Sequence, residues 1–256
     1  MSIPFYKYQG TGNDFVMIDN RQGIFPHNET LVAKLCDRKF GIGADGLILI
    51  ENHDNLDFEM IYFNADGSQS LCGNGSRCAV SFANFLGIIE TQTHFLTIDG
   101  EYEANLRDNL VYLHMRDQKH PTKYDSHYFL NNGSPHHIIF VSDVEVENVF
   151  SQGAKIRYSE PYKPDGTNVN FVEIKEGNTI FVRTYERGVE DETLSCGTGI
   201  TASALAAADK GLKSPIAVEA KGGELEVRFD KKNNNSFENI WLIGPAQQVF
   251  TGRFDI

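Results

Sequence analysis

Two cysteines, each followed by glycines and by a run of small and apolar residues, are the residues of this 256-residue chain best suited to chemistry. The first stretch is Cys72-Gly73-Asn74-Gly75 and the second is Cys196-Gly197-Thr198-Gly199. The runs after them predict two buried helices, and each helix would end near a glycine, Gly87 or Gly211, since glycine is favoured just past a helix C-terminus. We therefore expect each thiol to lie at the start of a helix.

The N-terminus of a helix suits a reactive thiol. Its backbone N–H groups lack intrahelical partners and carry a partial positive charge, so they bind anions and stabilise a thiolate. This position lowers the pKa of a cysteine from about 8.5 towards physiological pH, which makes the thiolate a working base. The same N–H groups could hold a substrate carboxylate beside the Cα–H bond that the thiolate attacks.

The presence of two such thiols narrows the reaction class. A protease or acyltransferase needs one nucleophile, a base and an oxyanion site. Two equivalent thiols instead suit removal of a proton from one face of a carbon and delivery of a proton to the other face. The pair therefore predicts racemisation or epimerisation, with the carbanion stabilised as an ene-diolate by helix dipoles and N–H groups.

The composition, with 41% hydrophobic and 23% charged residues, is typical of a soluble globular protein. A formal net charge of −12 argues against nucleic acid or an anionic membrane as a partner. The start of the chain lacks the order of a signal peptide, and no uncharged apolar run approaches the roughly 18 residues of a membrane span. We expect a cytoplasmic protein that acts on a small molecule, and the sequence alone does not set whether it is a homodimer.

The remaining cysteines and the histidines do not suggest a metal centre. Four cysteines are too few for a disulfide scaffold, so reduced thiols are expected, and Cys36 and Cys78 are interpreted as buried structural residues. The spacings of cysteine and histidine do not match a zinc site. No lysine is singled out as a Schiff-base former, although the sequence leaves a pyridoxal lysine open. The predicted chemistry uses no cofactor and no metal.

The order of predicted elements repeats at half the chain length. Cys196 follows Cys72 by 124 residues (196 − 72), and the turn glycine Gly223 follows Gly100 by 123 (223 − 100). Such an offset indicates an internal duplication. An amphipathic stretch from Thr30 to Phe40 predicts a further helix. We predict an α/β protein of the α+β type with two pseudo-symmetric domains, each a β-rich layer wrapped around a central helix, and an active site in the cleft between them.

The predicted domains are residues 1–118, which carry Cys72, and residues 119–256, which carry Cys196. A turn-rich stretch near residues 118–125 is the expected linker. The last roughly ten residues are expected to pack back onto the N-terminal domain.

In these motifs the sequence resembles the diaminopimelate epimerase family, and the resemblance covers essentially the whole chain. A single glycine-rich segment would be weak evidence for the family, but the joint occurrence of several matching segments in this order is specific. The matching segments are Gly10-Thr11-Gly12-Asn13-Asp14-Phe15, Asn64-Ala65-Asp66-Gly67-Ser68, Cys72-Gly73-Asn74-Gly75-Ser76-Arg77, Gly133-Ser134-Pro135-His136, Asn168 with Phe171, Tyr185-Glu186-Arg187-Gly188, and Glu192-Thr193 with Cys196-Gly197-Thr198-Gly199.

The resemblance implies interconversion of LL- and meso-diaminopimelate on the lysine and peptidoglycan precursor pathway, without pyridoxal phosphate or metal. It implies that Cys72 and Cys196 are the acid and base, with His136 and Glu186 beside the reacting centre. Backbone N–H groups that would bind the reacting carboxylate are those of Gly73, Asn74, Gly197 and Thr198. Side chains that would hold the distal amino acid end are Asn13, Asn64, Asn168 and Arg187, with Glu186 accepting from an ammonium.

The chain departs from the family pattern in three places. Many members have Gln where this chain has Gly46, and many have Asn where it has Ser134. The spacer between Ser68 and Cys72 holds three residues, against four in other members. These departures bear on substrate contacts and leave both cysteines in register.

Two other readings compete with this one. The nearest is a proline-racemase-like enzyme, which is disfavoured because the four distal polar residues exceed what a small apolar side chain requires. The other is a ligand binder or thiol redox switch without catalysis, in which Cys72 and Cys196 form a disulfide.

Overall fold

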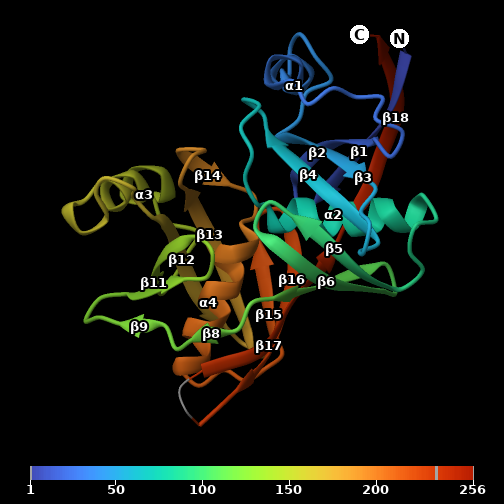
Figure 1. The fold of residues 1–256 in the computed structure, drawn as a ribbon. Helices are drawn as coiled ribbons and strands as arrows, with labels where there is room; N and C mark the ends of the chain where they lie inside the picture. The colour runs from blue at the N-terminus through green and yellow to red at the C-terminus, as the bar shows by residue number, and fades with distance from the viewer. Residues whose placement is uncertain (1, 234–235, 256) are drawn as a thin grey trace. The chain divides into compact units, whose positions relative to one another are not determined.

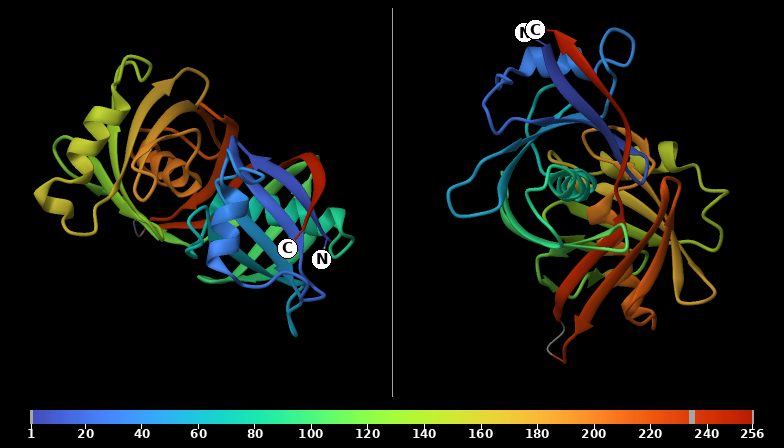
Figure 2. Two further views of the ribbon diagram at one scale, coloured as in Figure 1. Left: turned by 90° about the horizontal axis from the view of Figure 1, so that it is seen from above. Right: turned by 90° about the vertical axis from the view of Figure 1, so that its right-hand side faces the viewer.

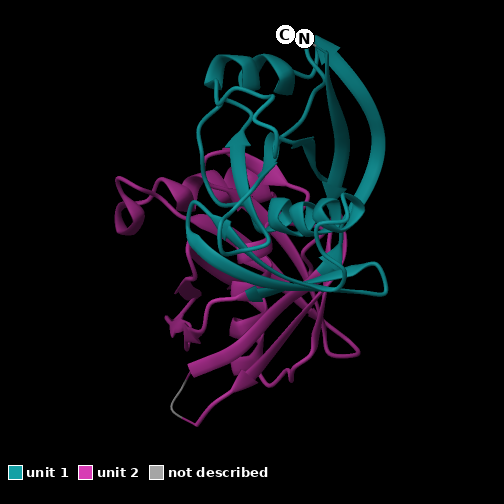
Figure 3. Ribbon diagram, turned by 45° about the vertical axis from the view of Figure 1, so that its right-hand side comes forward, with its two compact units in different colours: residues 1–114, 244–256 teal, residues 115–243 magenta. Residues whose placement is uncertain are grey.

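The computed structural model of the protein describes residues 2–233 and 236–255, and the chain divides into two compact units (Figures 1 and 3). Unit 1 comprises Met1–His114 and Gly244–Ile256, and unit 2 comprises Met115–Ile243. The stretch expected to be a linker, 118–125, lies in unit 2 and contains the short strands β8 (Gln118–Lys119) and β9 (Thr122–Lys123). None of the helices in the described residues is long and apolar enough to span a membrane.

The described residues of unit 1 form eight strands and two helices. Its neighbouring strands pair in the order β18, β1, β2, β3, β4, β5, β6 and β7, with parallel pairing only for β2 with β3 and for β4 with β5. The strands are β1 (Ser2–Gly10), β2 (Asn13–Asp19), β3 (Gly46–Glu51), β4 (Phe58–Asn64), β5 (Gln92–Thr97), β6 (Gly100–Arg107), β7 (Leu110–Met115) and β18 (Gln247–Asp255). The helices are α1 (Glu29–Cys36) and α2 (Gly73–Phe85). Helix α2 contacts β1, β2, β3, β4 and β6, and Figure 2 (right) shows it end-on among these strands.

Unit 2 repeats this plan. Its strands and helices are β8, β9, β10 (Tyr128–Asn131), β11 (Pro135–Phe140), α3 (Val149–Arg157), the short helix η1 (Glu160–Tyr162), β12 (Asn168–Lys175), β13 (Thr179–Glu186), β14 (Asp191–Thr193), α4 (Gly197–Asp209), β15 (Ile216–Ala220), β16 (Gly223–Lys231) and β17 (Ser236–Pro245). Parallel pairing joins β11 to β12 and β13 to β15, and the other pairs are antiparallel. Helix α4 contacts β10, β11, β12, β13, β15 and β16 and lies among these strands (Figure 2, left).

The order of elements confirms the predicted duplication. In unit 1 a parallel pair (β2, β3) is bridged by α1, and β4 leads through α2 to its parallel partner β5. In unit 2 the same sequence is β11, α3, β12, β13, α4 and β15, with β14 inserted. Both units thus wrap a β layer around a central helix, as predicted. Helix α3, which we did not predict, is the counterpart of α1.

The two central helices begin and end alike. Each has 13 residues, and their N-caps are Cys72 and Cys196, both with extended backbone. Gly87 (φ 70°) and Gly211 (φ 106°) follow the two C-caps. In each case backbone bonds from the glycine and the next residue return to the last turn, as in a Schellman motif. The predicted helix starts and ends are therefore confirmed at both sites.

Helix α1 is shorter than predicted. The sequence predicts Thr30 to Phe40, but the helix ends at Cys36. The next residue, Asp37, has extended backbone, and its side chain accepts hydrogen bonds from the backbone N–H groups of Lys39 and Phe40. These local bonds compete with the helix and end it.

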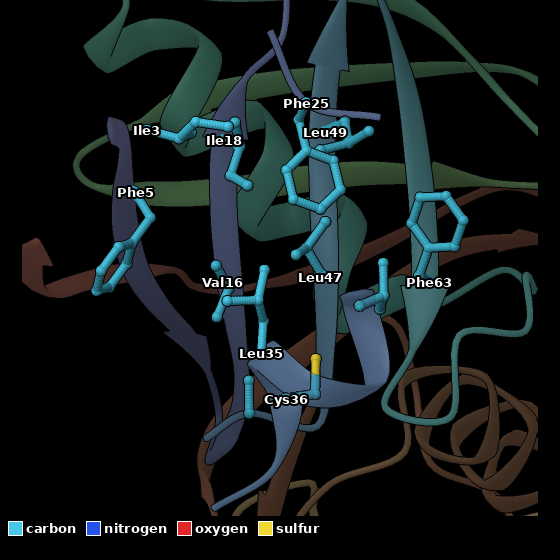
Figure 4. Close-up of a cluster of buried hydrophobic side chains, with 12 residues drawn as sticks. Ile3, Phe5, Val16, Ile18, Phe25, Leu35, Cys36, Leu47, Leu49 and Phe63 are labelled. Atoms are coloured by element: carbon cyan, nitrogen blue, oxygen red, sulfur yellow. The ribbon is translucent and has the colours of Figure 1, made fainter. Parts of the chain in front are cut away.

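The sheet of unit 1 is buried on both faces. One face forms a core with α1 that contains Val16, Ile18, Leu47 and Leu49 (Figure 4). Because side chains alternate along a strand, the residues between them face α2. Ile48, for example, lies close to Gly75 of α2. Burial on both faces explains the uninterrupted apolar runs of β2 and β3.

Candidate active site

The first candidate half-site surrounds Cys72 at the start of α2. The Sγ of Cys72 accepts the backbone N–H of Gly75 at 3.4 Å, which caps the helix. The thiol donates to Oδ1 of Asn13 at 3.4 Å, and Nδ2 of Asn74 donates to the same oxygen at 3.3 Å. The structure therefore brings three predicted residues, Asn13, Cys72 and Asn74, into one hydrogen-bonded group, with Gly73 as the first residue of the helix.

The amide orientation of Asn13 follows from its other partner. Its Nδ2 donates to Oδ2 of Asp45 at 2.7 Å, and a carboxylate can only accept. Asp45 is held in turn by Arg38, with N and O 2.6 Å apart. The amide oxygen of Asn13 must therefore face Cys72, which is the arrangement that suits a protonated thiol.

Asn64 lies at the end of β4 and holds the loop that leads to Cys72. Its Nδ2 donates to the hydroxyl of Ser68 at 3.0 Å, and its Oδ1 accepts from the hydroxyl of Ser70 at 3.0 Å. These hydrogen bonds of Asn64 thus go to the loop that precedes Cys72.

Gly46, one of the departures from the family pattern, begins β3 under the ring of Tyr62. A Cβ at this position would lie 2.5 Å from Cε2 of Tyr62 and 3.0 Å from its hydroxyl. The backbone carbonyl oxygen of Phe63 would also lie 2.5 Å away, so Tyr62 and Phe63 together take up the space of a side chain at position 46.

Arg77 is a buried charged residue close to Cys72 that the sequence analysis did not single out. It belongs to α2 and is fully buried, and its hydrogen bonds go to neutral groups, the hydroxyl of Thr11 at 3.0 Å and the carbonyl of Pro245 at 3.5 Å. It is close enough to Cys72 and Cys78 for its charge to act on both thiols, and burial lowers its pKa. A charged residue in a helix otherwise made of small and apolar residues was the signal available in the sequence.

The second candidate half-site surrounds Cys196 at the start of α4. Cys196 is 7% exposed, and its Sγ lies 3.6 Å from the hydroxyl oxygen of Thr198. That hydroxyl also lies 3.0 Å from Nε2 of His136. Gly197 is the first residue of the helix, so predicted residues again gather at a helix N-terminus.

His136 lies on β11 and is completely buried. Burial, with a smaller effect from the charge of Arg187, lowers the pKa of His136 to about 3. Its imidazole is therefore neutral at physiological pH. A neutral ring can donate or accept a hydrogen bond but adds no positive charge.

Asn168 organises the turn that carries Glu186 and Arg187. Its Oδ1 accepts the backbone N–H of Arg187 at 2.8 Å, and its Nδ2 donates to the hydroxyl of Ser134 at 2.8 Å. Ser134, the second departure, thus supplies the acceptor for Asn168. The guanidinium of Arg187 reaches the carbonyl of Asp165 at 3.5 Å and is partly exposed, as is Glu186 at the end of β13.

Asn170, two residues after Asn168 on β12, was not predicted as a site residue. It is completely buried and contacts His136. The signal in the sequence was its spacing, because residues two apart on a strand face the same side. Among the described residues, no group of three or more His, Cys, Asp or Glu side chains could hold a metal ion.

Comparison of the chain with known families and proteins gives a consistent result. A family model described as diaminopimelate epimerase matches residues 5–117 and 128–249. The chain is 52% identical over 253 residues to the diaminopimelate epimerase of Flavobacterium psychrophilum, which covers 97% of this chain and 98% of that protein. It is 44% identical to the diaminopimelate epimerase of Chlorobaculum tepidum, with 95% of this chain and 98% of that protein covered.

Solved structures with the same fold are more distant in sequence. A PhzF-family phenazine biosynthesis protein of Bacillus anthracis matches with a TM-score of 0.76 at 14% identity, covering 100% of both chains. A hydroxyproline epimerase of Agrobacterium vitis matches with a TM-score of 0.70 at 14% identity, covering 98% of this chain and 92% of that chain. At this identity the likeness extends to the two-domain fold.

Proposed function

Because the chain belongs to the diaminopimelate epimerase family and is an isomerase, we propose that it interconverts LL- and meso-diaminopimelate by a two-base reaction at Cα. One observation carries this proposal. Two helices of equal length, in equivalent places of two duplicated units, each have a cysteine as the N-cap. The reaction would serve lysine and peptidoglycan precursor synthesis, and we expect it in the cytoplasm.

In the proposed reaction one cysteine starts as a thiolate and the other as a thiol. The thiolate takes the proton from Cα, and the electron pair of the broken C–H bond passes into the carboxylate to give an ene-diolate. The thiol then delivers its proton to the opposite face of Cα. The configuration inverts, the first cysteine ends as a thiol, and the second ends as a thiolate. No oxidant, reductant or external proton is consumed.

The developing negative charge needs positive partners. We assign this to the N-terminal ends of α2 and α4, whose N–H groups at Gly73, Asn74, Gly197 and Thr198 are proposed to bind the reacting carboxylate. His136 and Glu186 are proposed to lie beside the reacting centre. Because burial keeps His136 neutral, its proposed part is that of a hydrogen-bonding group rather than a cation.

The distal end of the substrate is a second amino acid group. We propose that Asn13, Asn64, Asn168 and Arg187 bind it. The guanidinium of Arg187 can hold a carboxylate through two parallel hydrogen bonds, and Glu186 can accept from an ammonium. Asn64 is hydrogen-bonded to its own loop, so the proposal requires it to exchange at least one of these bonds for the substrate.

The test is a solvent-exchange assay. Purified protein under reducing conditions, with no added cofactor, should convert LL-diaminopimelate to the meso form in D2O, and NMR should show one deuterium at one Cα. Proline and hydroxyproline are assayed in parallel. No isomer from diaminopimelate would refute the proposal, and turnover of the prolines alone would reassign the substrate.

A further inference from the structure

A chain of hydrogen bonds runs from the core of unit 2 to Cys196. It begins at Asn170 on β12, passes through the ring of His136 and the hydroxyl of Thr198, and ends at Sγ of Cys196. The successive distances are 3.1, 3.0 and 3.6 Å. Asn170 and His136 are both completely buried, so bulk water does not compete for these bonds.

The side-chain amide of Asn170 determines which groups in this series of hydrogen bonds donate and which accept. Its Nδ2 lies 3.3 Å from the backbone carbonyl of His137, which can only accept, so the atom at that position must be the amide nitrogen. Its Oδ1 accepts from the hydroxyl of Thr184 at 3.0 Å. The two hydrogens of Nδ2 therefore serve the carbonyl of His137 and Nδ1 of His136. The Nδ1 atom must accept, and it carries no proton.

The consequence passes along the chain. A neutral imidazole whose Nδ1 accepts has its proton on Nε2, and this proton is donated to the oxygen of Thr198. The hydroxyl hydrogen of Thr198 then cannot point at His136 and is available for Cys196. A hydroxyl that donates to sulfur favours the thiolate over the thiol.

We propose that Asn170 is a positioning residue that locks His136 in its Nε2–H tautomer and thereby turns the hydroxyl of Thr198 towards Cys196, where it stabilises the thiolate. This inference deepens the proposed function, on which its catalytic meaning rests. The tautomer and the thiol reactivity can be measured without turnover.

The series of hydrogen bonds from Asn170 to Cys196 has no counterpart at the equivalent positions of unit 1. Strand register places Phe15 opposite Gly46 and His136 opposite Asn168, so Phe15 is the counterpart of His136. By the same register, Ile48 is the counterpart of Asn170. Unit 1 therefore has two apolar side chains where unit 2 has a polar relay.

Other titratable groups near α4 are distributed between its ends. Arg187, after β13, acts on His136. At the far end of α4, Asp209 accepts from Tyr128 of β10 and pairs with His120, and Lys231 of β16 donates to the carbonyl of Ala208. Because Arg187 acts on His136, it is kept unchanged in every variant below.

The first measurement is the tautomer of His136 by 15N NMR of the imidazole, assigned by the loss of its signals in His136→Gln. In the wild type we expect a protonated Nε2 and an unprotonated Nδ1. In Asn170→Asp the carboxylate can only accept, so Nδ1 should become protonated. A wild-type ring protonated at Nδ1, or an Asn170→Asp ring whose Nδ1 stays unprotonated, would overturn the proposal.

The second measurement is the pH dependence of iodoacetamide alkylation at Cys196, followed by mass spectrometry. Thr198→Val, which keeps the shape and removes the hydroxyl, should raise the pKa of Cys196 by about 1 to 2 units, because a hydrogen bond to a charged group contributes that much. Thr198→Ser should restore the wild-type value. Cys72 in the same sample is the internal control. An unchanged Cys196 profile in Thr198→Val refutes the relay even if the protein is an active epimerase, whereas an inactive protein with the expected profiles refutes only the proposed function.

Discussion

Strands β3 and β12 occupy the same place in their units, but they present different side chains to the central helix. In β3 the residue that contacts the helix is Ile48, whereas in β12 the equivalent residue is Asn170. In the two helices the more polar residue is instead in unit 1. Arg77 of α2 is fully buried, and the residue at the matching position of α4 is the neutral Thr201, whose hydroxyl donates to the carbonyl of Gly197.

On the proposals above, the two units act on their thiols by different physical means. Around Cys72 the amide oxygen of Asn13 accepts from the thiol, and the buried charge of Arg77 acts on the sulfur at a distance, without a hydrogen bond to it. Around Cys196 the means is an oriented hydroxyl at the end of a polar relay. After duplication the two halves could diverge in chemistry while keeping the helix start that both require.

The largest effect is expected from removing either thiol. Cys72→Ala and Cys196→Ala should each reduce epimerisation by about 10²- to 10⁴-fold, the usual contribution of one general acid or base. Deuterium incorporation and isomer formation are followed together. Cys36→Ala, a buried cysteine of the α1 core, is the matched control and should retain turnover per folded molecule. Near-wild-type turnover in either single variant would contradict the proposal that both cysteines act as acid and base.

Acid should destabilise unit 2 before unit 1. Burial lowers the pKa of His136 and of His137 to about 3. As the pH falls from 6.5 towards 3, these histidines bind protons in the unfolded state but not in the folded state, so the free energy of unfolding decreases. The cost at pH 5 is about 2 kcal/mol per histidine. In unit 1 the pKa of Asp14 is lowered to about 2 by its bonds to Arg38 and Lys7, which outweigh burial, so its stabilising contribution is lost only below about pH 4.

Hydrogen exchange at pH 7, 5 and 3.5 measures this order. Protection should fall first in β11 and β12, and later in β1 and β2. Simultaneous loss in both units, or earlier loss in unit 1, would contradict the assigned difference.

The glycines at the third position of the two helices should respond differently to alanine. At Gly199 a Cβ would lie 2.4 Å from Oδ1 of Asn170, whereas at Gly75 the nearest atom would be the flexible Cδ1 of Ile48, at 3.1 Å. Both changes gain about 1 kcal/mol of helix propensity. Overpacking costs about 1 to 3 kcal/mol, so after this gain Gly199→Ala should destabilise by up to about 2 kcal/mol and Gly75→Ala by less than about 1 kcal/mol. Urea unfolding curves of the two variants provide the measurement, and equal effects would count against the rigid placement of Asn170.

The smallest effect concerns the buried charge of unit 1. Arg77→Met should raise the pKa of Cys72 by about one unit, because a nearby positive charge favours the thiolate and the variant removes it. The pH profile of Cys72 alkylation gives the value, and Arg77→Lys should largely restore it. Cys196 in the same sample should not change. A Cys72 profile that is the same in Arg77→Met and in the wild type would show that the charge does not act on this thiol.

Much of the secondary structure could be predicted from short segments of the sequence. The starts of α2 and α4 at cysteine, their ends before glycine, and the strands on either side depend on capping, glycine conformation and hydrophobic runs, which short segments determine by themselves. Helix α3 was missed because it has few buried apolar residues and contains Gly153, which breaks the usual pattern. The structure explains this glycine, since a Cβ there would lie 2.3 Å from Cβ of Tyr185.

By itself, the sequence determined the duplication, the two cysteine-capped helices and the family of the chain, because these follow from order, spacing and residue type. Only the tertiary structure decided that Asn13 turns its oxygen to Cys72, that Arg77 is buried behind it, and that Asn170 faces His136. The reason is physical. The direction of an amide and the cost of a buried charge depend on partners brought together by strand pairing from distant parts of the chain.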